Sequence, residues 1–211
     1  MTQKSKPLFI SFEGGEGSGK STLIKGLYSS LKKEGFEVFK TREPGGTTLG
    51  EEIREILLHQ KEHSISSMAE LLLFLTSRAQ HIQEVIQPHL DKGHIVLCDR
   101  FNDSTIAYQG IARGVGKEKA QELCNLACQG LSPNLTFILD LDPSKGLKRI
   151  EKMDKKWDRL EDLKLSFHQK VHQGYHTLAK EEPSRIHLID ATMSKKEVFE
   201  KAWGPILKNL S

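Results

Sequence analysis

Residues 14–21 have the sequence GGEGSGKS, which fits the pattern G-x-x-x-x-G-K-[ST]. The glycines allow successive backbone N–H groups to curve around phosphate oxygens, and a helix beginning at Lys20 adds its positive N-terminal end. The Lys20 side chain would reach the β- and γ-phosphates of a nucleotide, and the Ser21 hydroxyl would bind Mg²⁺. A plain strand-to-helix turn is the alternative. Because an apolar strand precedes the segment and an amphipathic helix follows it, we predict a phosphate-binding loop.

On either side of this loop, short apolar runs alternate with helical patterns. The strands are predicted at residues 8–12, 38–40, 94–99, 135–140 and 186–190. The helices are predicted at residues 20–33, 49–58, 67–87 (ending near Pro88), 117–129, 144–152, 163–180 and 195–207, with a helix start at 104–109. This alternation is typical of an α/β fold with a mainly parallel sheet. No linker rich in Pro, Gly or Ser divides the chain, so one domain over residues 1–211 is expected.

The composition excludes several classes of protein. The 31 basic and 28 acidic side chains give a net charge of +3, too balanced for a dedicated nucleic-acid coat. The longest apolar run, residues 71–75, is far shorter than the ~20 residues of a membrane span, and no signal peptide is recognisable. The chain has three cysteines, Cys98, Cys124 and Cys128, which are too few for a disulfide framework. We interpret them as small buried hydrophobic residues. We predict a cytoplasmic protein without nucleic-acid or membrane partners.

The use of the nucleotide is the next question. A GTPase switch would need a D-x-x-G element and an N-K-x-D base reader, and the sequence contains neither. A small kinase needs an acceptor pocket, cations for both phosphates and a lid that excludes water. Two kinds of protein stay open at this point. One is a small kinase, whose acceptor the loop alone does not specify. The other is a regulator that binds a nucleotide but transfers no phosphoryl group.

Two further segments carry a family resemblance. Residues 99–109, DRFNDSTIAYQ, and residues 41–47, TREPGGT, resemble the signature segments of thymidylate kinases, and the similarity extends from about Leu8 to Asp190. The resemblance implies the P-loop nucleoside monophosphate kinase fold, with a five-stranded parallel sheet flanked by helices on both faces. It also implies Mg²⁺-dependent transfer of the γ-phosphoryl group of ATP to dTMP, which gives dTDP for dTTP biosynthesis, and a homodimer.

The resemblance and the loop together assign residues to the two substrates. The expected ATP-binding residues are Gly14, Gly15, Glu16, Gly17, Ser18, Gly19, Lys20, Ser21 and Thr22. The expected dTMP-binding residues are Glu16, Arg42, Pro44, Arg54, Phe74, Arg78, Arg100, Ser104, Thr105, Tyr108 and Gln109. The metal ligands are expected to be Ser21 and Asp99. Asp99 ends an apolar strand, which is a usual position for a carboxylate that binds Mg²⁺; a cap at the end of the strand is the alternative interpretation.

Within the dTMP site, the family roles differ by residue. The resemblance implies that Phe74 stacks on thymine and that Arg78, one helical turn later, reads the carbonyl edge of the base; from the sequence alone, a core position is favoured for Phe74, although the nearby Arg78 argues for a polar partner there. Thr105 and Gln109 resemble residues that contact the base. Tyr108 resembles the ring under the deoxyribose.

The charged residues of this site have alternatives of their own. Glu16 resembles the carboxylate that serves the 3′-hydroxyl. Arg100 suits the acceptor phosphate, with a structural pair to Glu13 as the alternative. Arg42 and Arg54 are assigned to the acceptor phosphate, and an ordinary surface ion pair is the alternative interpretation of each.

The lid is expected over residues 149–160 and is expected to be mobile. One type in the family carries an arginine in the phosphate loop after the carboxylate; this chain has Gly17 there and resembles the other type, with its basic residues in the lid. Lysines stand where arginines are usual: Lys152, Lys155 and Lys156. The predicted catalytic cations are therefore Lys20, Arg100, Arg149 and Arg159, with a merely solvated charged loop as the alternative for the lid.

Overall fold

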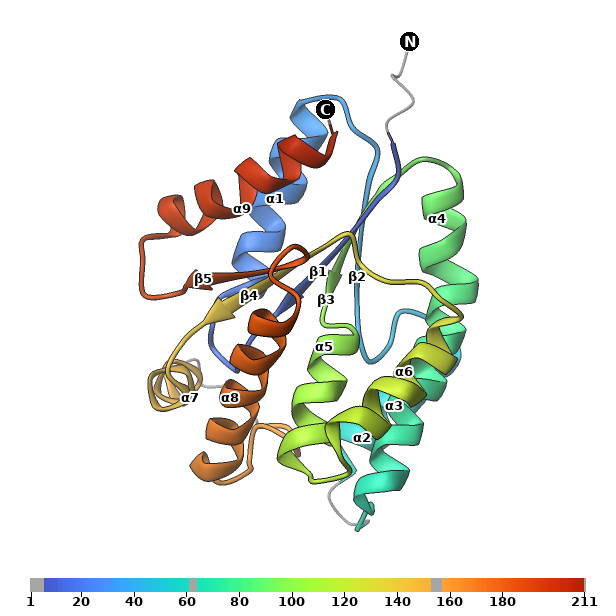
Figure 1. The fold of residues 1–211 in the computed structure, drawn as a ribbon, viewed down its shortest axis with the longest axis vertical. Helices are drawn as coiled ribbons and strands as arrows, with labels where there is room; N and C mark the ends of the chain where they lie inside the picture. The colour runs from blue at the N-terminus through green and yellow to red at the C-terminus, as the bar shows by residue number, and fades with distance from the viewer. Residues whose placement is uncertain (1–5, 61–63, 153–156, 211) are drawn as a thin grey trace.

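Five parallel strands form the centre of the molecule. The computed structural model describes residues 6–60, 64–152 and 157–210. The strands are β1 (Leu8–Glu13), β2 (Val38–Arg42), β3 (Ile95–Asp99), β4 (Leu135–Asp140) and β5 (Ile186–Asp190). Their order in the sheet is β2-β3-β1-β4-β5, and every neighbouring pair is parallel (Figure 1). The prediction of a five-stranded parallel sheet is confirmed.

Helices connect the strands, as the alternating pattern predicts. The α-helices of the described residues are α1 (Lys20–Lys33), α2 (Thr48–Leu58), α3 (Ser67–His81), α4 (Gln87–Asp91), α5 (Asn102–Thr105), α6 (Lys117–Cys128), α7 (Pro143–Glu151), α8 (Leu165–Glu181) and α9 (Lys195–Leu210). Two π-helical segments, η1 (Ile82–Ile86) and η2 (Ile106–Ala112), continue α3 and α5.

The helix that was predicted to end near Pro88 is longer than expected. It passes through η1 into α4 and ends at Asp91, with Pro88 in the first turn of α4. Proline has no N–H group, and its ring displaces the carbonyl four residues earlier, which here belongs to Glu84 inside η1. A wide π-turn accommodates that displacement without ending the helix. The segment that was read as a helix start at residues 104–109 likewise begins at Asn102 and extends to Ala112.

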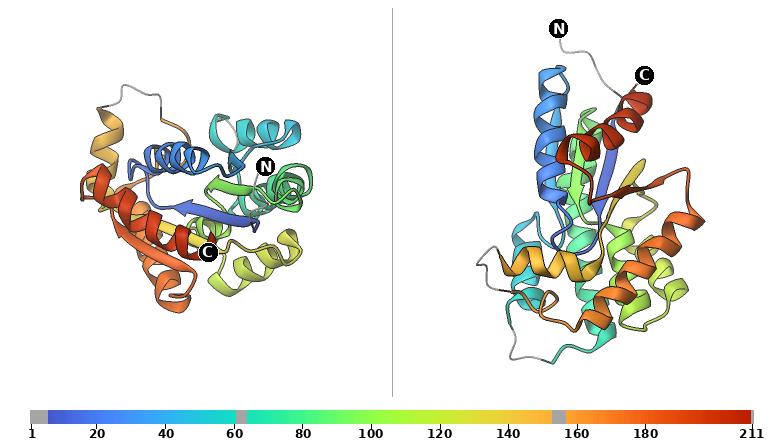
Figure 2. Two further views of the ribbon diagram at one scale, coloured as in Figure 1. Left: turned by 90° about the horizontal axis from the view of Figure 1, so that it is seen from above. Right: turned by 90° about the vertical axis from the view of Figure 1, so that its left-hand side faces the viewer.

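The alternation along β1 assigns each face of the sheet to a set of helices. Leu8, Ile10 and Phe12 pack with residues of α1 and α9, whereas Phe9 packs on the opposite face with η1 and Phe101. That opposite face is covered mainly by α3, η2, α6 and α8. Figure 2 shows α1 on one side of the strands and α8 on the other. Helices therefore flank both faces, as predicted.

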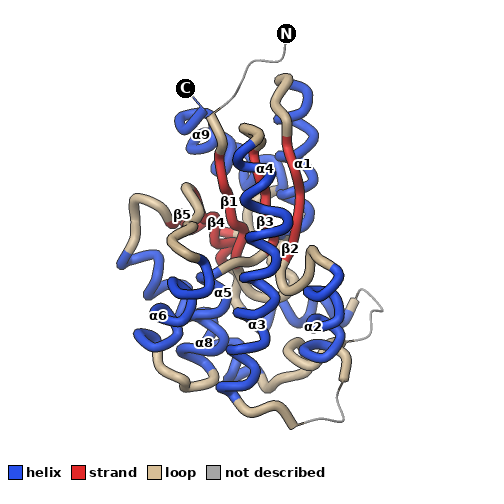
Figure 3. Tube along the Cα trace, turned by 90° about the vertical axis from the view of Figure 1, so that its right-hand side faces the viewer, coloured by secondary structure: helices blue, strands red, loops and turns tan. Residues whose placement is uncertain are grey.

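The carboxyl ends of all five strands meet at one edge of the sheet. Beyond that edge, α2, α3, α5 and α8 form a helical region (Figure 3). In open α/β sheets, ligands bind at this edge. The three cysteines are all buried and free, as the sequence predicts. No helix among the described residues is both long and apolar enough to cross a membrane.

Candidate active site

The loop between β1 and α1 curves around the Lys20 side chain. Gly14, Gly17 and Gly19 have φ angles of 129°, 66° and 100°, which favour glycine. Lys20 Nζ donates hydrogen bonds to the carbonyl oxygens of Gly14 at 3.0 Å and Gly15 at 3.1 Å. Because α1 begins at Lys20, its first N–H groups add to the positive potential of this loop. The loop has the geometry of an anion site.

The fold leaves no room for a side chain at Gly17 in the phosphate loop. A Cβ atom at Gly17 would collide with the carbonyl of Gly146 in α7, and its φ of 66° is itself unfavourable for other residues. A Cβ atom at Gly146 would collide in turn with the carbonyl of Glu16. The close approach of α7 to the loop therefore depends on two glycines.

Ser21 and Asp99 lie together at the start of α1 and the end of β3. Ser21 Oγ donates a hydrogen bond to Asp99 Oδ2 at 3.2 Å. A hydroxyl and a carboxylate are the hard oxygen ligands that suit Mg²⁺. These donors fit a magnesium ion that is bound together with nucleotide phosphates, as the sequence predicts.

Arg100, Glu16 and Tyr108 form a charged group in the middle of the site. Arg100 Nη2 lies 2.5 Å from Glu16 Oε1, and the Tyr108 hydroxyl donates to the same oxygen at 3.0 Å. Burial alone would raise the pKa of Glu16, but the charges of Arg100 and Lys20 outweigh it and lower that pKa to about 2. The ion pair of Arg100 is thus made with Glu16, whereas Glu13 was the alternative partner considered from the sequence.

Glu13 instead holds the segment that follows β3. Its two carboxylate oxygens accept hydrogen bonds from the backbone N–H of Phe101 at 2.7 Å, from the Ser104 hydroxyl and from the Tyr175 hydroxyl at 3.3 Å. Burial, reinforced by the nearby charge of Asp103, raises the pKa of Glu13 to about 7. A buried carboxylate therefore ties β1, α5 and α8 together under the site.

Arg78 is the largest fully buried side chain among the described residues, and its partners come from the two segments that follow β2 and β3. Nε donates to Glu43 Oε2 at 2.7 Å, and Nη2 donates to Thr105 Oγ1 at 3.0 Å. Its guanidinium also lies 5.0 Å from the centre of the Phe101 ring. The paired charge of Glu43 more than compensates for burial and raises the pKa of Arg78. Arg78 is therefore a fixed cation in the wall of the site.

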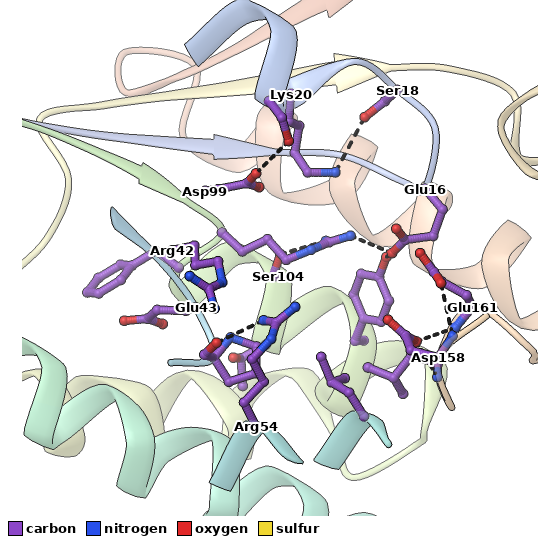
Figure 4. Close-up of a pocket in the computed structure, with 18 of the residues that line it drawn as sticks. Glu16, Ser18, Lys20, Arg42, Glu43, Arg54, Asp99, Ser104, Asp158 and Glu161 are labelled. Carbon is purple, nitrogen blue, oxygen red and sulfur yellow. Dashed lines mark hydrogen bonds and ion pairs between the residues drawn. The ribbon is translucent and has the colours of Figure 1, made fainter. Parts of the chain in front are cut away.

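Arg42 and Arg54 lie close enough for their charges to interact, and Arg54 lies at the opposite end of the site from Lys20 (Figure 4). Arg54 Nη1 donates to the carbonyl of Pro44 at 2.9 Å, and Arg42 pairs with Glu51 at 2.9 Å on a half-exposed surface. Burial and the charge of Arg42 lower the pKa of Arg54. Two cations held together in this way favour a doubly charged anion between them.

The two arginines that flank the expected lid have protein partners. Arg149 donates from Nη1 to the Gly17 carbonyl at 3.2 Å and from Nη2 to the Ala191 carbonyl at 3.4 Å. Arg159 donates from Nε to the Leu57 carbonyl at 2.7 Å and pairs with Glu70 at 2.6 Å. Lys152 is exposed, whereas Lys155 and Lys156 lie outside the described residues. The mobility of the lid stays a prediction.

One cavity of about 420 Å³ collects most of the predicted residues. Those that line it are Glu16, Gly17, Ser18, Gly19, Lys20, Ser21, Thr22, Arg42, Pro44, Arg54, Phe74, Arg78, Asp99, Arg100, Ser104, Thr105, Tyr108 and Gln109. Four predicted residues do not line it: Gly14, Gly15, Arg149 and Arg159. Phe74 is both a core residue and part of the cavity wall, so the two interpretations of it are compatible.

Comparison with known proteins agrees with this geometry. The sequence model of the family described as Thymidylate kinase matches residues 12–202. The chain belongs to the thymidylate kinase family. A thymidylate kinase of Protochlamydia amoebophila is 54% identical over 206 residues, covering 94% of this chain and 92% of the relative. One from Synechococcus is 48% identical over 199 residues, covering 94% of each. A crystal structure of thymidylate kinase from Ehrlichia chaffeensis matches with a TM-score of 0.76 and 34% identity, covering 95% of this chain and 98% of that one.

Several residues of this thymidylate kinase site were not assigned from the sequence. The cavity is also lined by Glu43, Leu58, Phe101, Ile150, Asp158, Leu160 and Glu161. Glu43 and Phe101 stand inside the two signature segments, so their position could have indicated a role. Glu70 lies outside both signature segments, so nothing in the sequence indicated its role. In the structure it accepts hydrogen bonds from Gln109, Arg113 and Arg159.

Proposed function

We propose that this chain transfers the γ-phosphoryl group of ATP to dTMP, releasing ADP and dTDP, as a step of dTTP biosynthesis. The observation that carries this proposal is the one cavity that joins the phosphate loop to the acceptor side. The phosphoryl donor and the acceptor can therefore bind in the same cavity, with cations around them. Phosphoryl transfer depends on such positioning and on charge neutralisation.

On the ATP side, the loop would hold the β- and γ-phosphates through its backbone N–H groups and Lys20. Burial and the charge of Arg100 lower the pKa of Lys20. An ammonium group that is costly to bury gains from an anionic phosphate beside it. Ser21 and Asp99 would hold the accompanying Mg²⁺, which neutralises phosphate charge when bound.

On the dTMP side, the base would lie against the Phe74 ring with Arg78, Thr105 and Gln109 at its edge. An aromatic face with a few polar groups at its edge, which fix the orientation of the ligand, is usual for a small-molecule site. Arg78 is already oriented by Glu43 and Thr105, so little ordering is left to be done on binding.

The sugar and the acceptor phosphate would lie closer to the loop. Tyr108 and Glu16, which both line the cavity and share a hydrogen bond, would contact the deoxyribose. Arg42, Arg54 and Arg100 would surround the acceptor phosphate. Pro44 and Ser104 complete this wall.

Transfer itself requires no general base, because the dTMP phosphate is already a nucleophile at neutral pH. The proposed barrier reduction comes from in-line positioning and from cations that stabilise the transferring phosphoryl group. We assign that role to Lys20, Arg100, Arg149 and Arg159, with residues 149–160 closing as a lid. Arg159 must then leave Glu70, to which it is bound here.

Three further points stay predictions. The homodimer rests on the family resemblance alone, the cytoplasmic location rests on the composition, and the type with basic lid residues rests on the resemblance together with Gly17. The absence of nucleic-acid and membrane partners also stays a prediction.

Product identification tests the proposed function. Phosphorus NMR of the purified chain with ATP, dTMP and Mg²⁺ is expected to show ADP and dTDP in equal amounts, and no product once EDTA removes the metal. Formation of ADP with free phosphate, or with no change in dTMP, would contradict the proposal.

A further inference from the structure

Asp140, His172 and His176 form a cluster outside the substrate cavity. Asp140 is the last residue of β4, and the histidines lie one turn apart on α8, which lies beside the end of that strand (Figure 1). His172 Nε2 lies 2.6 Å from Asp140 Oδ1, and His176 Nε2 lies 3.0 Å from the same oxygen. None of the three residues lines the cavity.

The spacing of these donor atoms is close to that of a metal centre. One nitrogen from each ring and a carboxylate oxygen all lie within 4.8 Å of one another. Ligand distances of about 2.0–2.2 Å place neighbouring donors roughly 3–3.5 Å apart. Two imidazoles at positions i and i+4 on one helix face converge from one side, and a carboxylate approaches from the other. Small side-chain rearrangements would therefore admit an ion between these three donors.

The cluster is open to water and lies on an acidic edge. The side chains of Asp140, His172 and His176 are 30%, 32% and 36% exposed. Asp190, paired with Asp140 in the register of β4 and β5, adds a second carboxylate to this edge. Water can therefore fill the coordination positions that three protein ligands leave open.

We propose that Asp140, His172 and His176 bind one divalent transition-metal ion, with Zn²⁺ as the representative case. Two imidazole nitrogens select ions such as Zn²⁺, Ni²⁺ or Co²⁺ over Mg²⁺, which prefers oxygen ligands. A second cluster in the described residues, Glu43, His81 and Cys98, is less suited. It is completely buried, and its carboxylate is engaged by Arg78.

Titration of the full-length chain tests this site. Co²⁺ added to metal-free protein is expected to give the visible absorption of a protein-bound ion at one equivalent, and Zn²⁺ is expected to displace it, whereas Mg²⁺ is not. His172→Ala and His176→Ala should each weaken Zn²⁺ binding, measured by calorimetry, at least about tenfold. His59→Ala removes an exposed histidine outside the cluster and serves as the matched control.

Two results would overturn the proposal. One is wild-type protein that binds no Co²⁺ or Zn²⁺; the cluster would then be a hydrogen-bonded contact between α8 and β4. The other is Zn²⁺ binding that both cluster variants keep at full strength. Asp140→Asn, a near-isosteric change, provides a third arm if an alanine variant fails to fold, and it should also weaken binding.

Discussion

Replacement of Glu13 by glutamine is expected to make the stability of the protein less dependent on pH. The pKa of Glu13 is raised from 4.5 to about 7, mainly because the carboxyl is completely buried. The native state therefore binds more protons than the unfolded state between these pH values, and the free energy of unfolding falls as pH rises through this window. Below pH ~4.5 this destabilisation is absent, and above pH ~7 it is complete.

The size of the effect follows from the same pKa values. A pKa difference of about 2.5, at about 1.4 kcal/mol per pKa unit, gives a total of about 3.5 kcal/mol, of which about 2.5 kcal/mol falls between pH 5 and pH 8. Glutamine keeps the shape and one carbonyl oxygen for the Phe101 N–H, and its NH₂ group can donate to the hydroxyls of Ser104 and Tyr175. The variant thus removes the titration and retains the contacts.

Urea unfolding at pH 5 and pH 8, followed by circular dichroism without nucleotides, measures this effect. Wild-type protein is expected to lose about 2.5 kcal/mol more than Glu13→Gln between the two pH values. Any constant difference between the two proteins cancels in this comparison. Equal losses would show that Glu13 does not titrate in this window, and the account of its burial would be wrong.

Three further predictions concern the chemistry. Lys20→Ala should lower kcat by about 10³-fold while dTMP binding, measured by calorimetry, survives; loss of both would indicate an unfolded variant. Arg159→Ala should lower kcat by about 10²-fold with KM values within about threefold, and unchanged kcat would remove Arg159 from the transfer step. Arg78→Lys keeps a charge beside Glu43 but loses the planar fork, so the kcat/KM ratio of dTMP to dCMP should fall about tenfold. An unchanged ratio would exclude Arg78 as a reader of the base.

Local sequence was sufficient for most of the fold and for the phosphate loop. The five strands are apolar runs between turn residues, and the loop is a contiguous motif, so neither depends on contacts between distant residues. The continuation of the α3 helix past Pro88 to Asp91 was not predicted, because proline usually ends a helix and nothing in the sequence signals the π-turn that accommodates it.

The partners of the charged side chains were beyond the reach of sequence patterns. Arg78 pairs with Glu43 across 35 residues, and Arg159 pairs with Glu70 across 89 residues. A helical spacing specifies which side chains share a face, but only the tertiary fold specifies what that face meets. The same reason explains why Glu13 was considered as a partner of Arg100, which pairs with Glu16 instead.

An acceptor panel tests the central claim most directly. ADP release from ATP and Mg²⁺ would be measured with dTMP, dUMP, dCMP, dGMP, dAMP and thymidine as separate acceptors. We expect strong release with dTMP, weaker release with dUMP and near-background rates with the others. Preference for a different acceptor would contradict the assignment of the base site around Phe74 and Arg78, and silence with all six acceptors would contradict the proposed kinase activity itself.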